Sequence, residues 1–113
     1  QPRDKQHGYP MRSVFRLDHY GDAVALLPGN FDLVLLVWPN LDTPFGEQVA
    51  HAMRSGQIMI LEGEGKGGNT ATEEFFDVLS ADFERLDAET LALNEHHRTF
   101  PGLHDRWQIM RKK

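Results

Sequence analysis

Two apolar runs along the chain predict the buried strands of a sheet. Asp32–Trp38 is a near-continuous apolar run without alternation, and Ile58–Leu61 is a second, shorter one. Such runs are typical of strands that are covered on both faces inside a parallel sheet. Between them, Thr43 and Pro44 resemble a helix start, followed by apolar residues at helical spacing, Phe45, Val49, Ala52 and Met53. A right-handed crossover then places the two runs side by side and parallel.

The flanking segments predict one further strand and two further helices. Ser13–Leu17 alternates apolar and polar residues, which fits a short strand, and Gly21–Leu27 carries an apolar stripe of helical spacing. After the second buried run, Thr70 and Glu73 have the spacing of a capping box. We expect the helix that follows to bury Phe75, Phe76 and Leu79.

The final third of the sequence predicts an antiparallel pair. Phe83–Leu93 is long and partly alternating, and Arg106–Met110 carries apolar residues on both faces. The polar stretch Asn94–Asp105 joins them as a loop. The chain, residues 1–113, is therefore predicted to be one α/β domain, with residues 1–12 extended or flexible. Its mixed, mostly parallel, Rossmann-like sheet has about five strands, flanking helices and a C-terminal antiparallel hairpin.

Composition limits the classes of protein to which the chain can belong. With 113 residues and 40% hydrophobic content, it can bury one core. Twelve basic residues against 17 acidic ones give a net charge of −5, which argues against nucleic acid as a partner. The absence of cysteine excludes disulfides and thiolate chemistry. No apolar run approaches the ~20 residues of a membrane span, so we expect a soluble, cytoplasmic protein without a membrane partner.

The turn after the first buried run carries polar and aromatic side chains. Trp38, Asn40 and Asp42 follow the carboxyl end of the predicted central strand, where α/β folds place their ligands. One interpretation is that they bind a small molecule. The other, which we favour, is that Trp38 packs and that Asp42 with Thr43 caps the next helix.

A glycine-rich loop follows the second buried run. It has the G-x-G-x-x-G spacing of a dinucleotide-binding turn, at Gly63, Gly65 and Gly68. Asp87 follows at about the distance of a ribose-binding acid, and the helix start near Thr70 adds donors for an anion. The flanking Glu62 and Glu64 would repel a pyrophosphate, so we favour a flexible loop at the carboxyl edge of the sheet over a nucleotide site.

Three histidines and an acid lie close together in the last third of the chain: His96, His97, His104 and Asp105. Their spacing matches no standard zinc pattern, and the neighbours His96 and His97 would point to opposite sides of an extended segment. We therefore expect no metal site. His104 and Asp105 are interpreted as a structural turn, and an acid/base role for His104 is the weaker alternative.

Three segments carry a resemblance to a known family. They occur in the order FDLVLLVWPN, QIMILEGEGKGGNTATEEFFDVL and FPGLHDRWQIMRK. They resemble the C-terminal half of class I S-adenosylmethionine-dependent methyltransferase-like domains, in particular a group with a WPP-type turn, a glycine-rich loop and a late Pro-Gly-x-His-Asp-Arg segment. The resemblance covers Val14–Arg111. It implies a seven-strand sheet without its first strands, ending in a reversed hairpin.

The family pattern is incomplete in this sequence. The resemblance implies a cofactor-holding glycine-rich turn after a first strand and an acid after a second, and no such strand and turn precede Ser13. The turn Trp38–Leu41 lacks the second proline and the aromatic residue of the motif that orients a target nitrogen. Asn69 stands where the family loop has cysteine. These departures predict a domain without cofactor chemistry.

We therefore expect a non-catalytic module that binds a small molecule or another protein, with no cofactor. The sheet edge where the absent strands would pair predicts a homodimer. Two alternatives stay open: a methyltransferase whose cofactor half is supplied upstream or by a partner chain, and a nucleotide-phosphate binder that uses Gly63–Gly68. The candidate ligand-binding residues are Trp38, Asn40, Asp42, Glu62, Gly63, Gly65, Gly67, Gly68, Asn69, Thr70, His104 and Asp105.

Overall fold

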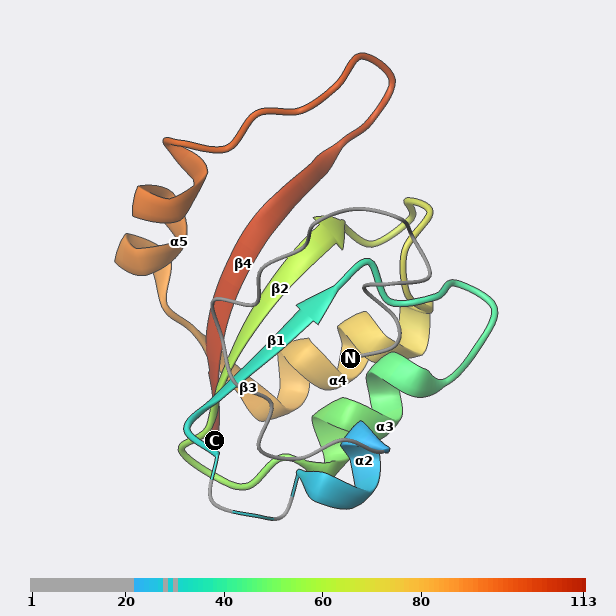
Figure 1. Cartoon of the computed structure of the whole chain (residues 1–113), viewed down its shortest axis with the longest axis vertical. Coiled ribbons are helices and arrows are strands. Elements are labelled where there is room, and N and C mark those ends of the chain that lie inside the picture. The colour runs from blue at the N-terminus through green and yellow to red at the C-terminus, as the bar shows by residue number, and fades with distance from the viewer. Residues whose placement is uncertain (1–21, 28, 30) are drawn as a thin grey trace, which may run out of the picture.

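A computed structural model describes residues 22–27, 29 and 31–113, which form an α/β fold with a four-stranded, open, mixed sheet (Figure 1). Its strands are β1 (Leu33–Val37), β2 (Ile58–Glu64), β3 (Phe83–Arg85) and β4 (Asp105–Lys112), in the spatial order β1-β2-β4-β3. β1 and β2 are parallel, as predicted. β4 is antiparallel to both β2 and β3. The further strand predicted over Ser13–Leu17 lies outside the described residues.

The helices of the described residues lie on one side of the sheet and at one edge. α2 (Ala23–Leu26), α3 (Phe45–Ala52) and α4 (Glu73–Asp82) form a layer over one face, and α5 (Asp87–Asn94) lies beside β4 (Figure 1). α2 falls inside the helix predicted over Gly21–Leu27. Among the described residues, no helix combines the length and the apolarity that crossing a membrane requires.

The core lies between the sheet and the helix layer. Its largest fully buried side chains are Phe75, Met59 and Val49. The inward stripe predicted for α4 is confirmed, since Phe75, Phe76 and Leu79 are all buried. α3 approaches α4 closely at Gly46, where an added Cβ atom would lie 3.0 Å from the Phe75 ring. A larger residue at this position would displace that ring.

Among the described residues, the helices cover one face of β1, and the side chains of its other face are exposed, so the prediction that both faces are buried is wrong. Val34 and Leu36 pack toward the helix layer. Leu33, Leu35 and Val37 point to the other face and are 58%, 63% and 53% exposed. The cause is topological, because α2, α3 and α4 all lie on the same side of the sheet (Figure 1). We call the side opposite these helices the open face.

Both predicted helix caps are wrong. α3 begins after Pro44 with no side-chain hydrogen bond at its cap, so neither Thr43 nor Asp42 caps it. α4 is capped by Thr72, whose Oγ1 accepts a hydrogen bond from the N–H of Phe75. The hydroxyl of Thr70 bonds instead with the backbone of Glu64. Side-chain caps compete with other local partners, and sequence spacing alone does not decide between them.

Two element boundaries also differ from the prediction. β2 continues through Glu64, so the start of the predicted glycine loop is strand, because Glu62–Glu64 pairs with Asp105–Trp107 of β4. The strand predicted over Phe83–Leu93 ends at Arg85, and α5 begins at Asp87. The segment after Arg85 is rich in alanine, leucine and glutamate, which favour helix over strand.

α5 seals an edge of β4 with side chains rather than with a strand. Asn94 Nδ2 donates to Trp107 O at 2.9 Å, and Asn94 Oδ1 accepts from Trp107 N at 2.9 Å. One turn earlier, Thr90 Oγ1 accepts from Ile109 N at 3.0 Å. Residues four apart on a helix face match residues two apart on a strand, so α5 replaces part of a neighbouring strand. This contact fixes the segment between α5 and β4.

Candidate functional site

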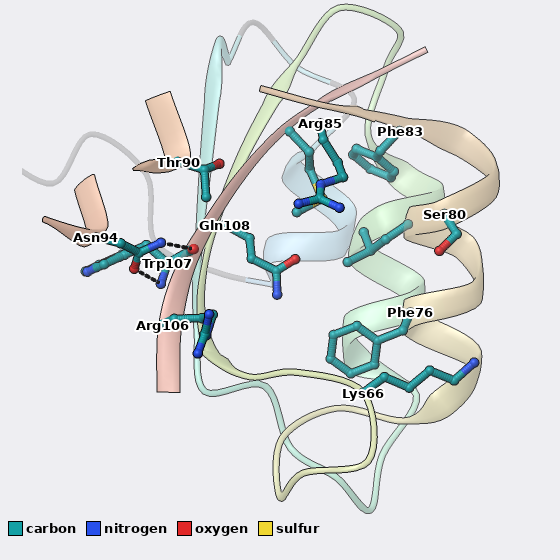
Figure 2. A pocket seen from close by; sticks show the side chains of 12 residues that line it. Lys66, Phe76, Ser80, Phe83, Arg85, Thr90, Asn94, Arg106, Trp107 and Gln108 are labelled. Carbon is teal, nitrogen blue, oxygen red and sulfur yellow. Dashed lines mark hydrogen bonds between the residues drawn. The ribbon is translucent and has the colours of Figure 1, made fainter. Parts of the chain in front are cut away.

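A cavity of about 550 Å³ lies between α4 and β4 (Figure 2). Its apolar wall is made by Phe76, Leu79, Phe83 and Met110. Three basic side chains, Lys66, Arg85 and Arg106, also line it, and the described residues of its lining include no acidic one. A chain of net charge −5 thus concentrates positive charge beside an apolar wall.

The three basic groups of this cavity differ in their partners. Lys66 Nζ lies 3.0 Å from Asp77 Oδ1, and this hydrogen bond raises the pKa of Lys66. Arg85 Nε lies 3.4 Å from Asp87 Oδ1, and both of these side chains are exposed. Among the described residues, no ion pair to Arg106 is present. Arg106 also lines a second cavity of about 440 Å³, together with His97 and Asp105.

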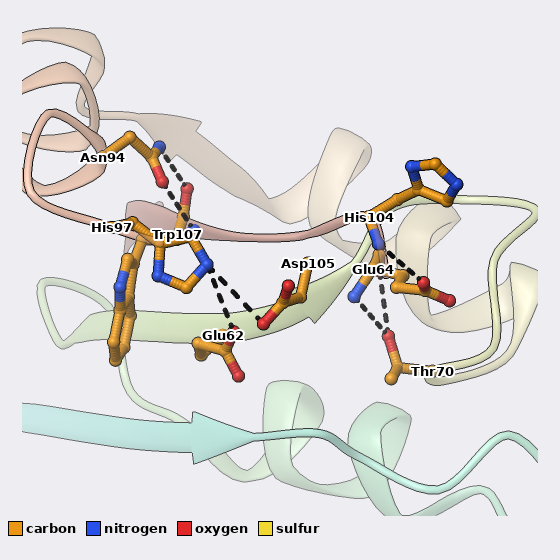
Figure 3. A network of polar contacts seen from close by, with 8 residues as sticks. All are labelled: Glu62, Glu64, Thr70, Asn94, His97, His104, Asp105 and Trp107. Carbon is orange, nitrogen blue, oxygen red and sulfur yellow. Dashed lines mark hydrogen bonds and ion pairs between the residues drawn. The ribbon is translucent and has the colours of Figure 1, made fainter. Parts of the chain in front are cut away.

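Next to the second cavity, two carboxyl groups and an imidazole converge (Figure 3). Glu62 lies near the carboxyl end of β2, Asp105 begins β4, and His97 lies between α5 and β4. His97 Nε2 is 3.5 Å from Asp105 Oδ2 and 3.9 Å from Glu62 Oε2. One atom from each side chain lies within 4.8 Å of the others. We call these three residues the Glu62–His97–Asp105 cluster.

The cluster is largely buried and incompletely hydrogen-bonded. The side chains of Glu62, His97 and Asp105 are 9%, 16% and 12% exposed. Three of their buried atoms have no hydrogen-bond partner among the described residues: Glu62 Oε2, His97 Nε2 and Asp105 Oδ1. Buried polar atoms are nearly always satisfied in folded proteins, so this arrangement calls for an explanation.

Burial and mutual repulsion shape the protonation of the two acids. Burial, reinforced by the neighbouring Asp105, raises the pKa of Glu62 to about 7, while His97 and the Trp38 indole act in the opposite direction. The hydrogen bond with Glu62 lowers the pKa of Asp105. Near neutral pH Glu62 is therefore partly protonated, while Asp105 keeps its negative charge.

Trp38, a predicted candidate, does reach this cluster. Its backbone N–H donates to Glu62 O at 2.7 Å, and its indole acts as a hydrogen-bond donor that lowers the pKa of the Glu62 carboxyl. Its φ is 46°, a left-handed conformation that a bulky residue rarely adopts. The strained turn after β1 thus ties the backbone of Trp38 to that of Glu62.

Asn40 and Asp42 do not join the cluster. Asn40 Oδ1 accepts a hydrogen bond from the N–H of Asp42 at 2.8 Å, and both residues are exposed. This bond forms a local turn after β1. Asn40 also makes an isolated bridge with Thr70, which ties this turn to the glycine-rich loop.

The carboxylate of Glu64 accepts hydrogen bonds from the backbone of the glycine-rich loop and of the segment before β4. Glu64 Oε1 accepts from Asn69 N at 2.7 Å, and Glu64 Oε2 accepts from His104 N at 3.0 Å (Figure 3). These hydrogen bonds lower the pKa of Glu64. Gly68 packs so closely that an added Cβ atom would lie 2.6 Å from Glu64 Cβ. The carboxylate of Glu64 thus takes up backbone donors that an incoming anion would need.

The remaining predicted candidates fall outside the cluster. Gly63 lies within β2, whereas Gly65 and Gly67 have open space where a side chain would be. The His104 side chain is exposed, and its backbone N–H provides the contact with Glu64. Asp87 begins α5 beside Arg85. The structure therefore brings together Glu62, Asp105 and Trp38 from the predicted set.

His97 is the one member of the cluster that is not among the site residues predicted from the sequence. Judged with its neighbours His96 and His104, it showed no metal-ligand spacing. Its partner Glu62 lies far earlier in the chain, and the two meet because β4 pairs with β2 after α5 has returned the chain to the sheet. No local pattern in the sequence predicts this contact.

The fold is α/β with an open mixed sheet, and a largely buried carboxylate–imidazole cluster lies at the carboxyl end of its parallel strands. Comparison of the chain with protein-family models, with curated proteins and with solved structures gave no match.

Proposed function

We propose that this chain is a non-catalytic binding module whose ligand is a small organic anion, held in the cavity between α4 and β4. One observation carries the proposal: an apolar wall and three basic side chains line the same cavity, and the described part of that lining has no acid. Its volume of about 550 Å³ falls in the usual range for small-molecule sites. The ligand class is therefore a molecule with an apolar body and one carboxylate or phosphate group.

Arg106 is the residue best placed to hold the anionic group. Lys66 and Arg85 each have an acidic neighbour, Asp77 and Asp87, whereas Arg106 has no ion-pair partner among the described residues. A guanidinium can bind a carboxylate or phosphate with two parallel hydrogen bonds. The aromatic and aliphatic wall next to it would cover the apolar part of the same ligand (Figure 2).

The test titrates octanoate into the full chain and follows the fluorescence of Trp107, which lines the cavity. A Trp38→Phe background leaves Trp107 as the reporter, because the chain has two tryptophans. We expect saturable binding of octanoate and much weaker binding of octanol and octylamine. Arg106→Gln should weaken octanoate binding by about tenfold or more, the value of a charged hydrogen bond.

Arg111→Gln is the matched control for this test. Arg111 lies on the same strand, pairs with Glu84 at 3.1 Å and does not line the cavity. It should leave octanoate affinity unchanged. Octanol binding as tightly as octanoate, or equal effects of the two arginine substitutions, would contradict the proposal.

The open face of β1 supports a second proposal, a protein-interaction role through homodimerisation. Leu33, Leu35 and Val37 form a row of apolar side chains, each more than half exposed. Apolar rows of this kind on a sheet favour association. Light scattering after size-exclusion chromatography should report a dimer, and Leu35→Lys should convert it to a monomer. A monomer at high concentration would exclude this role for the isolated chain.

The methyltransferase-like origin is likewise a proposal. The reversed strand β4, placed between β2 and β3, supports it, since the resemblance implies a sheet that ends in a reversed hairpin. Binding of S-adenosylmethionine stays a prediction that requires a cofactor half from elsewhere, and calorimetric titration of the isolated chain tests it.

Gly63–Gly68 gains no support as a phosphate site, because Glu64 accepts hydrogen bonds from the adjoining backbone.

A further inference from the structure

The Glu62–His97–Asp105 cluster lies apart from the cavity wall that would hold an organic anion. Glu62 and Asp105 come from neighbouring strands: Glu62 is opposite Trp107, and Asp105 is two residues before Trp107 on β4. Residues in this diagonal relation share one face of a sheet. The imidazole of His97 completes the group from the segment after α5 (Figure 3).

The burial of these two carboxyl groups side by side would destabilise the fold if their role were only structural. Two carboxyl groups lie together, nearly buried, and the ion pairs they make within the described residues are with His97. Glu62 is more than nine-tenths buried, and its Oε2 atom has no hydrogen-bond partner while facing His97 and Asp105. Buried acids without enough donors destabilise a fold unless a cation joins them.

The spacing of the atoms suits a metal ion better than it suits hydrogen bonding. At 3.5 Å and 3.9 Å, the imidazole nitrogen is too far from either carboxylate for a normal hydrogen bond. Two ligands of a tetrahedral zinc ion, each about 2.0–2.2 Å from the metal, lie about 3.3–3.6 Å apart. Small side-chain movements would therefore bring all three atoms into coordination distance.

Neighbouring side chains hold the three groups in place. The Trp107 ring lies edge-on to the His97 imidazole, with centroids 6.2 Å apart. Trp107 is fixed in turn by the two hydrogen bonds of Asn94. Trp38, directly after β1, donates its backbone N–H to Glu62 O at 2.7 Å. Metal ligands are commonly oriented by such supporting contacts.

We infer that Glu62, His97 and Asp105 form a binding site for a first-row divalent transition-metal ion such as Zn²⁺. The donor set is one imidazole nitrogen and two carboxylates, without thiolate. Imidazole favours transition ions over Mg²⁺ and Ca²⁺, which prefer oxygen ligands alone. Three protein ligands leave a coordination position for water or for an external ligand. His97 and Asp105 also line the second cavity, which is open to such a ligand.

The experiment titrates ZnCl₂ into the full chain by calorimetry at pH 7.5, after treatment with EDTA and dialysis. We expect one ion per chain with micromolar or tighter affinity, and no comparable binding of MgCl₂. His97→Gln and Glu62→Gln should each weaken Zn²⁺ binding at least about tenfold, because each removes a ligand. Visible absorption of bound Co²⁺ provides a second readout that depends on ligand geometry.

His96→Gln is the matched control, since His96 is the exposed neighbour of His97. It should leave Zn²⁺ affinity within about twofold, as expected for a surface side chain without a ligand role. Circular dichroism checks that each variant is folded, and Asp105→Asn replaces any variant that is not.

Failure to bind Zn²⁺, equal losses in His96→Gln and His97→Gln, or equal affinity for Mg²⁺ would each overturn the inference. Octanoate binding measured in EDTA is independent of this site, so the two proposals fail separately.

Discussion

The carboxamide of Asn94 pairs with the backbone of Trp107 through two hydrogen bonds of 2.9 Å, one donated and one accepted. This is the pattern that a neighbouring strand would present to β4. Its consequence is that the first half of β4 needs no further strand at this edge. The same contact supports Trp107, which lines the cavity and lies against His97.

Replacing Asn94 tests how much this edge contact contributes to stability. Asn94→Ala leaves the N–H and C=O of Trp107 without these partners, which should cost about 1–3 kcal/mol in the free energy of unfolding. Urea denaturation measures the change. Glu95→Ala, at the exposed next position, is the control and should stay within about 0.5 kcal/mol of wild type. Equal effects of the two substitutions would refute the edge role.

Glu62 should make the metal-free fold less stable as pH rises. Its pKa is about 7 in the fold, raised mainly by burial, against 4.5 in the unfolded chain. Between these values the folded state holds more protons than the unfolded state, so the unfolding free energy falls as pH rises from about 4.5 to about 7. Above pH 7 the cost stays constant.

Glu62→Gln removes this cost, so it should stabilise the metal-free protein at pH 8 by about 1–2 kcal/mol, a value reduced for solvent screening. At pH 5 most of the gain should be lost, because Glu62 is then almost fully protonated in the fold and partly protonated in the unfolded chain. Urea titrations in EDTA at the two pH values measure both differences. A gain that is the same at both pH values would show that the carboxyl is not buried as described.

Glu64 should have the opposite pH dependence. Hydrogen bonds from Asn69 and His104 lower its pKa in the fold, so its contribution is present above the unfolded value of 4.5 and is lost as pH falls through the folded value. Glu64→Gln should therefore lower the thermal midpoint at pH 7, with a difference from wild type that shrinks in acid. A thermal melt series from pH 7 to pH 3 tests this, and a constant difference would argue against it.

Phe75 should carry a large part of the core's stability. It is fully buried, with its ring against Gly46 and against Phe76 at a centroid distance of 5.2 Å. Phe75→Ala should cost about 3–5 kcal/mol, the usual value for removing a buried aromatic ring. Phe100→Ala is the matched control, because Phe100 is 75% exposed. Chemical denaturation compares the two, and similar losses would contradict this account of the core.

The sequence predicts the parallel strand pair and the inward face of α4 because these depend on local periodicity. The run around Leu33–Val37 is apolar at every position, and α4 repeats its buried residues at helical spacing. Coverage of the open face could not be predicted, because it depends on where the helices pack. The end of β2 was missed for a related reason: Glu62–Glu64 becomes strand by pairing with β4, a partner far along the chain.

The sequence predicts where in the fold the candidate site lies, but not every residue that forms it. Glu62 lies near the end of β2 and Asp105 begins β4. These two strand ends meet at one edge of the sheet, where α/β folds commonly place their ligands. His97 required knowledge of α5, because the alternating pattern of Phe83–Leu93 predicted a strand. With Asp87–Asn94 helical, Asn94 can reach Trp107, and the segment beyond it returns His97 to the sheet.

The placement of β4 between β2 and β3 sets an order of assembly. β3 is joined to the rest of the sheet through β4, and β4 follows every other described strand in the sequence. A ribosome that has translated residues only as far as α5 has therefore produced β2 without the strand that covers its second edge. Such a nascent chain would expose that edge to chaperones and to other chains until β4 emerges.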